Sequence, residues 1–138
     1  MQATTLSNAF VLRASAAQRS KQGLLNADAI SSETVASKAL WMGMVTLPPG
    51  ARANAHYHER HETAIYVVKG TGEMWYGVRL EERATFEPGD FIYIGAGVPH
   101  VPVNPSETDP MVAIIARTDP NEQESVVLLP ELDELVDS

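Results

Sequence analysis

The chain has 138 residues, of which 44% are apolar, which suits one domain with a single buried core and excludes a wholly disordered chain. Its net charge of −8, without any Lys/Arg cluster, argues against a nucleic-acid binder and against attraction to anionic membranes. Because it has no cysteine, neither a disulfide nor a thiolate metal site can form, and we expect a cytoplasmic protein.

The N-terminal 38 residues are expected to form a short strand and an arm that precede the main domain. Phe10–Arg13 has the composition of a strand, whereas residues 15–38 are polar and lack a clear period, with one turn or short strand near Leu24–Ile30. The first 27 residues contain no acidic residue and weakly resemble an organelle targeting segment. We interpret them instead as the first strand and a loop.

Residues 39–130 are predicted to form the main domain from short strands. Gly and Pro separate β-forming segments about every ten residues, and Ile65–Val68 is the strongest of them. Helical periodicity is sustained only over Leu129–Val136, and residues 131–138 are expected to be a solvated acidic tail. The pattern predicts an all-β antiparallel sandwich or barrel. The predicted strands are Ala39–Leu47, Ala53–His58, Thr63–Lys69, Glu73–Val78, Arg79–Phe86, Phe91–Ile94, Val98–Val103, Met111–Arg117 and Ser125–Leu129.

Three of the four histidines lie within six residues of one another. His56 and His58 are two positions apart on a predicted strand, so their side chains point to the same face. Neutral imidazole is the commonest metal-binding side chain, and two on one face supply two adjacent ligands. A third ligand must come from elsewhere in the fold, and His100 is the only histidine far away in the sequence.

The spacing around these histidines resembles the two motifs of the cupin family. In the first motif, five residues separate Gly50 from His56, and one residue separates His56 from His58. The second motif has spacings of five, one, two and three residues, and its elements here are Gly89, Gly95, Gly97, His100 and Asn104. Gly95 stands where the family has proline.

This resemblance implies a fold, a metal and an assembly. The fold is the cupin double-stranded β-helix, a jelly-roll barrel. Its open end would hold one divalent transition metal (Zn, Fe, Mn or Ni) on His56, His58, His100 and a fourth ligand. Small cupins are commonly homodimers, and the predicted Phe10–Arg13 strand could pair with the partner's sheet and cover an exposed edge.

The fourth ligand is open between two neighbouring residues. Glu62 follows His58 after three residues, as in the family, but seven residues rather than six separate it from Gly70. Strand parity counted back from Gly70 turns His61 and Thr63 toward the metal and Glu62 away, although a β-bulge could restore Glu62. Three His plus Glu resembles non-haem Fe or Mn cupin dioxygenases, whereas four His resembles zinc-dependent monocupin polyketide cyclases.

The pocket above the metal is expected to be apolar. Its candidate substrate-binding residues are Trp41, Met44, Thr63, Tyr76 and Tyr93, although strand parity allows only about half of the apolar candidates to face inward. Most of the nearby basic residues are expected at turns or on the outside; these are Arg52, Arg60, Lys69, Arg79 and Arg83. An uncharged or weakly acidic, ketonic or aromatic small molecule is therefore the expected substrate.

The function predicted from the sequence is that of a metal-dependent enzyme acting on this small molecule. The metal would act as a Lewis acid in cyclase-, isomerase- or lyase-like chemistry. A non-haem Fe or Mn cupin dioxygenase and a non-catalytic ligand-binding cupin are the alternatives. The sequence does not single out a catalytic acid or base.

Overall fold

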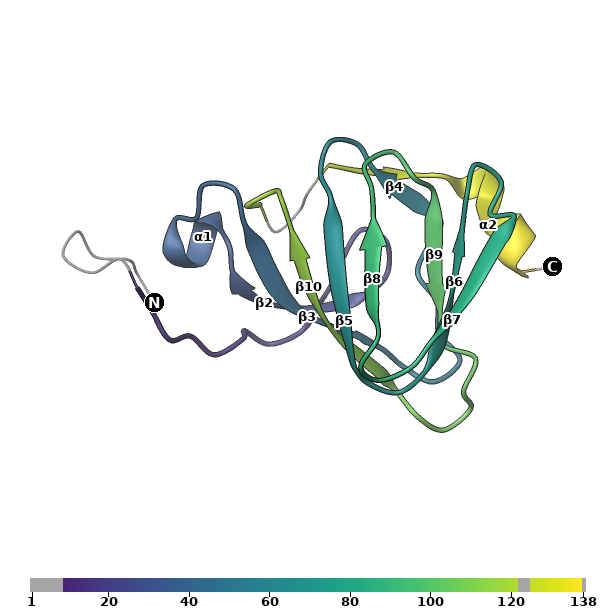
Figure 1. Ribbon diagram of the computed structural model, residues 1–138, viewed down its shortest axis with the longest axis horizontal. Helices are drawn as coiled ribbons and strands as arrows, with labels where there is room; N and C mark the ends of the chain where they lie inside the picture. Colours follow the sequence, from purple (N-terminus) through teal and green to yellow (C-terminus); the bar gives the residue numbers. More distant parts are fainter. Residues whose placement is uncertain (1–8, 122–124, 138) are drawn as a thin grey trace.

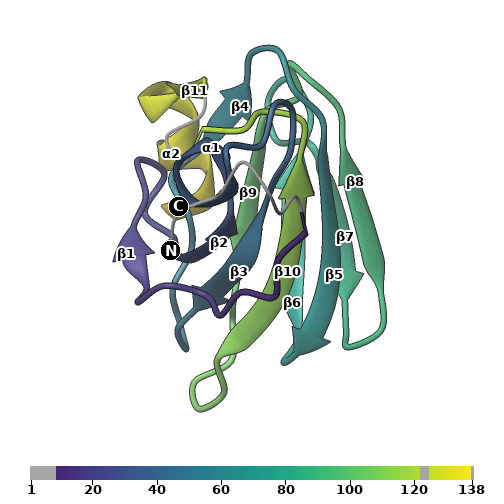
Figure 2. The ribbon, with the colours of Figure 1, turned by 90° about the vertical axis from the view of Figure 1, so that its left-hand side faces the viewer.

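Two antiparallel β-sheets face each other and enclose the core (Figures 1 and 2). The computed structural model describes residues 9–121 and 125–137. Among these residues, the larger sheet has the strand order β1-β2-β3-β10-β5-β8 and the smaller sheet has the order β11-β4-β9-β6-β7. The elements are β1 (Gln18–Arg19), β2 (Leu25–Ile30), α1 (Ser32–Val35), β3 (Trp41–Leu47), β4 (His56–His58), β5 (Thr63–Lys69), β6 (Gly72–Tyr76), β7 (Glu82–Phe86), β8 (Phe91–Ile94), β9 (His100–Val103), β10 (Met111–Arg117), β11 (Val126–Leu128) and α2 (Pro130–Asp137).

This architecture confirms the predicted all-β jelly roll. The nine strands expected between residues 39 and 129 are all present, with ends shifted by a few residues. Consecutive strands often lie in opposite sheets; for example, a tight turn joins β7 of the smaller sheet to β8 of the larger one. β7 and β8 are outer strands of their sheets, so the two sheets enclose the core without closing into a continuous barrel.

The core lies between the sheets and follows the two-residue alternation of the strands. In β10, Met111, Ala113, Ile115 and Arg117 are buried, whereas the residues between them are partly exposed. β10 pairs with β3 on one side and with β5 on the other. The buried apolar residues that contact one another there are Leu24, Trp41, Val45, Leu47, Ala53, Val67, Met74, Phe86, Ile94, Met111, Ala113 and Ile115.

Gly43 in β3 makes room for a buried tryptophan. A Cβ atom at Gly43 would lie 2.6 Å from the Cη2 atom of Trp41 and 2.5 Å from the backbone oxygen of Ala27. Any larger residue would therefore push the indole or β2 away. Trp41 is fully buried, and its Nε1 donates a hydrogen bond to Asp28, which fixes the indole against the larger sheet.

The acidic C-terminal segment is not a solvated tail, in contrast to the expectation. It forms the helix α2, which covers the outer face of the smaller sheet (Figure 1). Leu132 is buried there against Ala55, Leu80 and Val101. The apolar periodicity of this segment outweighs its charge, because the acidic residues between the leucines can face solvent or basic groups while the leucines pack.

The N-terminal segment also differs from the prediction. Residues 9–17 are irregular, so the strand expected over Phe10–Arg13 is wrong, and the first strand is β1. β2 pairs along β3 as a regular strand. Its buried residues include Asn26 and Asp28. Because a strand is recognised in a sequence by apolar residues at every second position, these polar residues hide the pattern.

A short helix, α1, follows β2 and begins with a capping box. The Ser31 side chain accepts hydrogen bonds from the backbone N–H groups of Glu33 and Thr34, and the Thr34 hydroxyl accepts one from Ser31 N. Within residues 9–121 and 125–137, no helix has the length and apolar character that crossing a membrane would need.

Candidate metal centre

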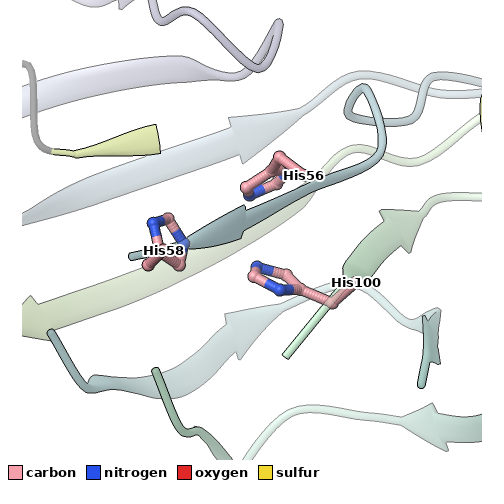
Figure 3. Close-up of side chains that lie close together, drawn as sticks. All are labelled: His56, His58 and His100. Carbon is pink, nitrogen blue, oxygen red and sulfur yellow. The ribbon is translucent and has the colours of Figure 1, made fainter. Parts of the chain in front are cut away.

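Three histidines from two strands meet at one end of the space between the sheets (Figure 3). β4 consists of His56, Tyr57 and His58, so the two histidines point inward and the tyrosine points outward. His100 opens β9, the neighbouring strand, and is paired directly with His56. The ring centroids of His56 and His100 are 4.3 Å apart, and His58 lies 5.0 Å from each.

Backbone carbonyl groups hold two of these rings in one tautomer. The Nδ1 atom of His56 is 2.6 Å from the backbone oxygen of Asn54, and Nδ1 of His100 is 2.8 Å from that of Val98. A carbonyl oxygen can only accept a hydrogen bond, so Nδ1 carries the proton in both rings. The Nε2 atom of each ring therefore keeps its lone pair, as a metal ligand requires.

All three rings are uncharged at neutral pH. Burial lowers the pKa of His56 to about 3, that of His58 to about 2 and that of His100 to about 4, because the charged imidazolium would lose its hydration. The neighbouring histidines lower each pKa further, and for His58 the charge of Arg117 adds to the effect. No proton has to leave before a cation binds.

The separations of the rings fit one cation. One ligand atom from each ring can be chosen so that the three atoms lie within 4.8 Å of one another. Nitrogen ligands about 2.1 Å from a tetrahedral Zn²⁺ ion lie about 3.4 Å apart, so closing onto an ion requires side-chain shifts of about 1 Å. His56, His58 and His100 could therefore hold a metal ion.

The structure separates the two residues considered for a fourth ligand. His61 is buried, and its ring centroid lies 4.6 Å from that of His58. Its Nδ1 atom is 3.7 Å from a carboxylate oxygen of Asp119. Glu62 is exposed and instead accepts a hydrogen bond of 2.7 Å from the hydroxyl of Tyr93, which is itself 67% exposed. His61 thus adjoins the cluster, and Glu62 lies outside it.

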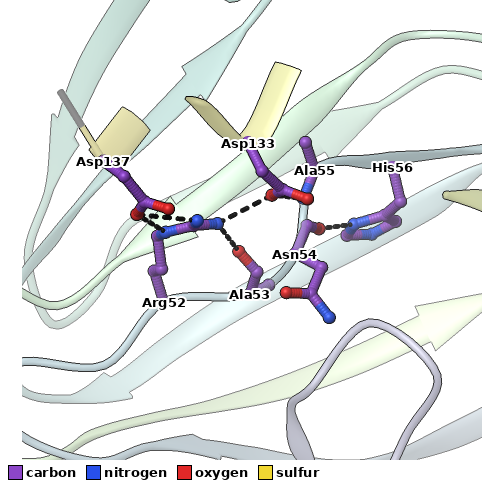
Figure 4. Close-up of polar contacts among 7 residues, drawn as sticks. All are labelled: Arg52, Ala53, Asn54, Ala55, His56, Asp133 and Asp137. Carbon is purple, nitrogen blue, oxygen red and sulfur yellow. Dashed lines mark hydrogen bonds and ion pairs between the residues drawn. The ribbon is translucent and has the colours of Figure 1, made fainter. Parts of the chain in front are cut away.

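Helix α2 helps to position β4 (Figure 4). Arg52, on the loop before β4, bonds to Asp133 at 2.9 Å and to Asp137 at 2.8 Å. The same carboxylate oxygen of Asp133 accepts a 2.8 Å hydrogen bond from Ala55 N, directly before His56. The Arg52 side chain also donates to its neighbour's carbonyl, Ala53 O. These bonds link the metal-site strand to the C-terminal helix.

A small cavity of about 50 Å³ adjoins the histidines inside the sheets. Of the predicted substrate-binding residues, Thr63 lines this cavity, and Trp41 is fully buried in the core. Met44 points to the opposite face of β3 from buried Val45, and Tyr93 is on the outside. Tyr76 and Tyr93 line a second, more open cavity of about 610 Å³, which shares the wall residues Met74, Phe86, Ile92 and Ile94 with the first. The five residues therefore do not form one site.

Arg117 lines the inner cavity and is the residue that the sequence reasoning missed. It was not among the residues considered for the pocket, yet Arg117 is 4% exposed and lies in the same cavity wall as His58 and His100. The alternation of β10 carried the signal, because Arg117 shares parity with buried Met111, Ala113 and Ile115. Asn104, by contrast, has a structural role: its amide donates hydrogen bonds to Leu47 O, Pro48 O and Asp109 O.

The sequence around this site matches a known family. The family model described as the cupin domain matches residues 43–116, more than half of the chain, including the three clustered histidines. The chain belongs to the cupin family. A comparison of this cupin with curated protein sequences gives no match.

Solved structures share the fold of this cupin. A cupin 2 conserved barrel domain protein from Salinispora arenicola CNS-205 superposes with a TM-score of 0.67 at 20% identity, over 81% of this chain and 91% of that chain. For oxalate decarboxylase from Bacillus subtilis the TM-score is 0.66 at 23% identity, over 80% of this chain and 29% of that chain. For DMSP lyase DddQ from Ruegeria pomeroyi DSS-3 it is 0.56 at 23% identity, over 67% and 44%. This cupin spans less than half of the two enzymes' length, and the likeness shows the fold alone.

Proposed function

We propose that this cupin is a metal-dependent enzyme that acts on a small carbonyl compound. The observation that carries the proposal is the set of three buried, uncharged imidazoles, two of which are held by backbone carbonyls with Nε2 available. A bound divalent metal would supply Lewis acidity, which polarises a carbonyl group. The cavity beside the histidines has a volume of about 50 Å³ and shares wall residues with a more open cavity of about 610 Å³, so we expect the group that reacts at the histidines to be small.

We further propose His61 rather than Glu62 as the fourth ligand. The buried ring of His61 adjoins His58, and Asp119 lies behind its Nδ1 atom, as carboxylates commonly do behind metal-bound histidines. An imidazole does not cancel the charge of the cation, whereas a carboxylate cancels one unit. A four-histidine site therefore supports the Lewis-acid reaction, cyclase-, isomerase- or lyase-like, better than the dioxygenase alternative.

The remaining residues of the site exclude water and hold the ligands. Trp41, Val67 and Ile94 are buried between the sheets, so a small substrate would be largely desolvated beside the histidines. Arg52 and Asp133 tie the start of β4 to α2 and limit the movement of His56. Such rigidity favours a fixed geometry around the reacting carbonyl group.

A homodimer is the assembly that we propose. The outer face of the smaller sheet is covered by α2, whereas the outward residues of β5 and β8 in the larger sheet are uncharged and exposed. These residues are Ala64, Tyr66, Val68, Phe91 and Tyr93. Each copy carries a net charge of −8, so an uncharged face is where a second copy can approach with the least repulsion. This face replaces the N-terminal strand as the expected contact.

Metal analysis combined with hydrogen–deuterium exchange tests the proposed enzyme. Protein purified without added metal, and protein loaded with Zn, Mn, Fe or Ni, would be analysed for metal content. Small ketones would then be followed by NMR in D₂O. We expect one metal per chain and α-hydrogen exchange that is faster with the loaded protein than with free metal, because a polarised carbonyl acidifies the adjacent C–H bond. A loaded protein without such exchange would favour the ligand-binding alternative, and His100→Ala is the metal-free control.

A further inference from the structure

The two sheets leave an open seam between β7 and β8. A tight turn joins the two strands, yet in the described part of the chain β7 pairs only with β6 and β8 pairs only with β5. Each of the two strands therefore has one unpaired edge, and the two edges belong to different sheets. The cavity of about 610 Å³, called the outer cavity below, lies along this seam, with Ala84 of β7 and Phe91 of β8 in its wall.

The outer cavity extends from the turn to the metal end of the sheets. Asp90 in the turn lines it, and so do Gly95 after β8 and Tyr76 at the end of β6. Tyr76 is the direct cross-strand partner of His100, so this end of the cavity adjoins the proposed metal site. Gly95 stands where the second cupin motif has proline, and a Cβ atom there would lie 3.8 Å from the Tyr93 ring, an ordinary contact. The cavity therefore has no side chain at this position of its rim.

The outer cavity shares part of its wall with the inner cavity of about 50 Å³ beside the histidines. Met74, Phe86, Ile92 and Ile94 line both cavities. A molecule that spans the two cavities would pass beside these four apolar side chains. Met74 is unbranched and has three rotatable side-chain bonds, so it can adapt to such a molecule. The arrangement suits a ligand with a small group at the histidines and a larger part in the outer cavity.

The wall of the outer cavity suits an uncharged, apolar group. Asp90 is the one charged residue among the wall residues that the structure describes, and its carboxylate accepts a hydrogen bond from Glu87 N in the turn. An apolar cavity of about 150 Å³ can hold one benzene molecule, and drug-sized ligands occupy sites of about 300–1,000 Å³. The outer cavity therefore has room for one or two rings. Phe86 and Tyr76 offer aromatic surfaces against which a ring can pack.

We propose that the outer cavity binds an apolar ring of the substrate, while the carbonyl group of the substrate reaches the histidines past Met74 and Phe86. The substrate class is then a ketone that carries an aromatic or bulky aliphatic ring, rather than a short ketone alone. This inference rests on the proposed function, because the metal would polarise the carbonyl group at the histidines. The binding of the ring itself needs no metal, so the two proposals can be tested separately.

Ketones with and without a ring test the proposal. Zn-loaded protein and chelator-treated protein would be titrated with 4-phenylbutan-2-one and with butan-2-one, and the methyl groups of the protein would be followed by NMR. We expect 4-phenylbutan-2-one to bind about tenfold or more tightly in both forms, because one buried methylene group alone can change binding about tenfold. The methyl signals of Met74, Ile92 and Ile94 should shift, since these residues line the outer cavity.

Two substitutions fill the outer cavity from opposite sides. Ala84 is the direct cross-strand partner of Met74, and neither Ala84 nor Gly95 lines the inner cavity. We expect Ala84→Phe and Gly95→Leu to reduce the preference for the phenyl ketone by about fivefold or more and to leave the metal content unchanged. Val78→Phe adds a ring at a position that is 77% exposed and lines neither cavity, so it should leave the preference unchanged.

The assembly of each variant has to be measured as well. Phe91 and Tyr93 line the outer cavity and also belong to the face that we propose for the dimer. Light scattering of Ala84→Phe and Gly95→Leu therefore separates a filled cavity from an altered dimer. A loss of ring preference at an unchanged mass supports the cavity assignment.

Two results would overturn the inference. One is that 4-phenylbutan-2-one binds no more tightly than butan-2-one, and the other is that its preference is unchanged in both cavity-filling variants. If Ala84→Phe does not fold, Gly95→Leu decides, because its Cβ atom makes only an ordinary contact. The α-hydrogen exchange described above separates the two proposals. Exchange without a ring preference contradicts the outer site alone, whereas a ring preference without metal binding or exchange contradicts the proposed function alone.

Discussion

His56 and His100 lie directly opposite each other on β4 and β9, with ring centroids 4.3 Å apart. The backbone pairing of the two strands sets this separation, so the site does not depend on long, flexible side chains. Each ring also bonds to the carbonyl oxygen two residues before it, Asn54 O or Val98 O. The same hydrogen bond to the backbone therefore orients one histidine ring in each of the two cupin motifs.

Loss of His100 should abolish high-affinity metal binding. Loss of a residue that only hydrogen-bonds to a metal ligand typically costs about 10–100-fold in metal affinity, so His100→Ala, which removes a ligand itself, should cost more than about 100-fold. Competition with a chromophoric chelator measures this change. Tyr57→Phe is the control, because Tyr57 lies between the two ligands of β4 but faces outward. Equal affinity in His100→Ala and Tyr57→Phe would contradict the assignment.

Substitutions at the two adjacent candidates should distinguish the fourth ligand. We expect His61→Ala to lower Zn²⁺ affinity by at least about tenfold, because the buried ring adjoins His58. Glu62→Gln should leave the affinity within about twofold, because its carboxylate is exposed and bonded to Tyr93. The opposite order would show that the loop rearranges to bring Glu62 to the cation.

Acid should destabilise the metal-free protein below about pH 6.5. Imidazoles of the unfolded chain titrate near pH 6.5, whereas the folded pKa values are lowered to about 3, 2 and 4 for His56, His58 and His100. Between about pH 4 and pH 6.5 the unfolded chain binds more protons, so the free energy of unfolding falls as pH falls, by up to about 1.4 kcal/mol per pH unit for each histidine.

Urea denaturation of chelator-treated protein at pH 7.5, 6 and 5 measures this slope. His58→Gln is the internal comparison, because it removes one of the three titrating groups and should reduce the slope by about one third. A pH-independent stability across this range would show that the rings are protonated, or solvated, in the folded protein.

The two carboxylates of α2 that bind Arg52 should contribute unequally to the stability of the fold. Asp133 is partly buried and also accepts a hydrogen bond from Ala55 N, so Asp133→Ala should lower the free energy of unfolding by about 1–3 kcal/mol. The Asp137 side chain is 66% exposed, so Asp137→Ala should cost under about 1 kcal/mol. Urea denaturation compares the two, and an equal loss would contradict the distinction.

A charge on the outer face of the larger sheet should separate the proposed dimer. Phe91 is 81% exposed and its ring contacts that of Tyr66 at 4.9 Å between centroids. Phe91→Glu would place two like charges in the interface of a symmetric dimer, so light scattering should change from a dimer to a monomer mass. Val78→Glu, 77% exposed after β6, should remain dimeric. A monomeric wild-type protein at micromolar concentration would exclude the dimer.

Local sequence patterns determined which segments are strands and which side chains share a face. The alternation of two residues placed His56 beside His58 and turned His61 and Thr63 away from Glu62, because side-chain parity depends only on neighbours in the chain. The same rule failed for β2, where Asn26 and Asp28 are buried, and it was not applied to Arg117.

Only the tertiary structure decided how distant strands pair. The meeting of Arg117 with Trp41 and Thr63 depends on strand registers between segments that lie far apart in the sequence. The pairing of His56 with His100 is of the same kind, and the sequence implied it only through the resemblance to the two cupin motifs. Register between distant segments results from the packing of the whole core, so no local pattern encodes it. The chain therefore revealed its histidines directly, but the cationic group beside them and the helix that holds β4 became visible only in the folded protein.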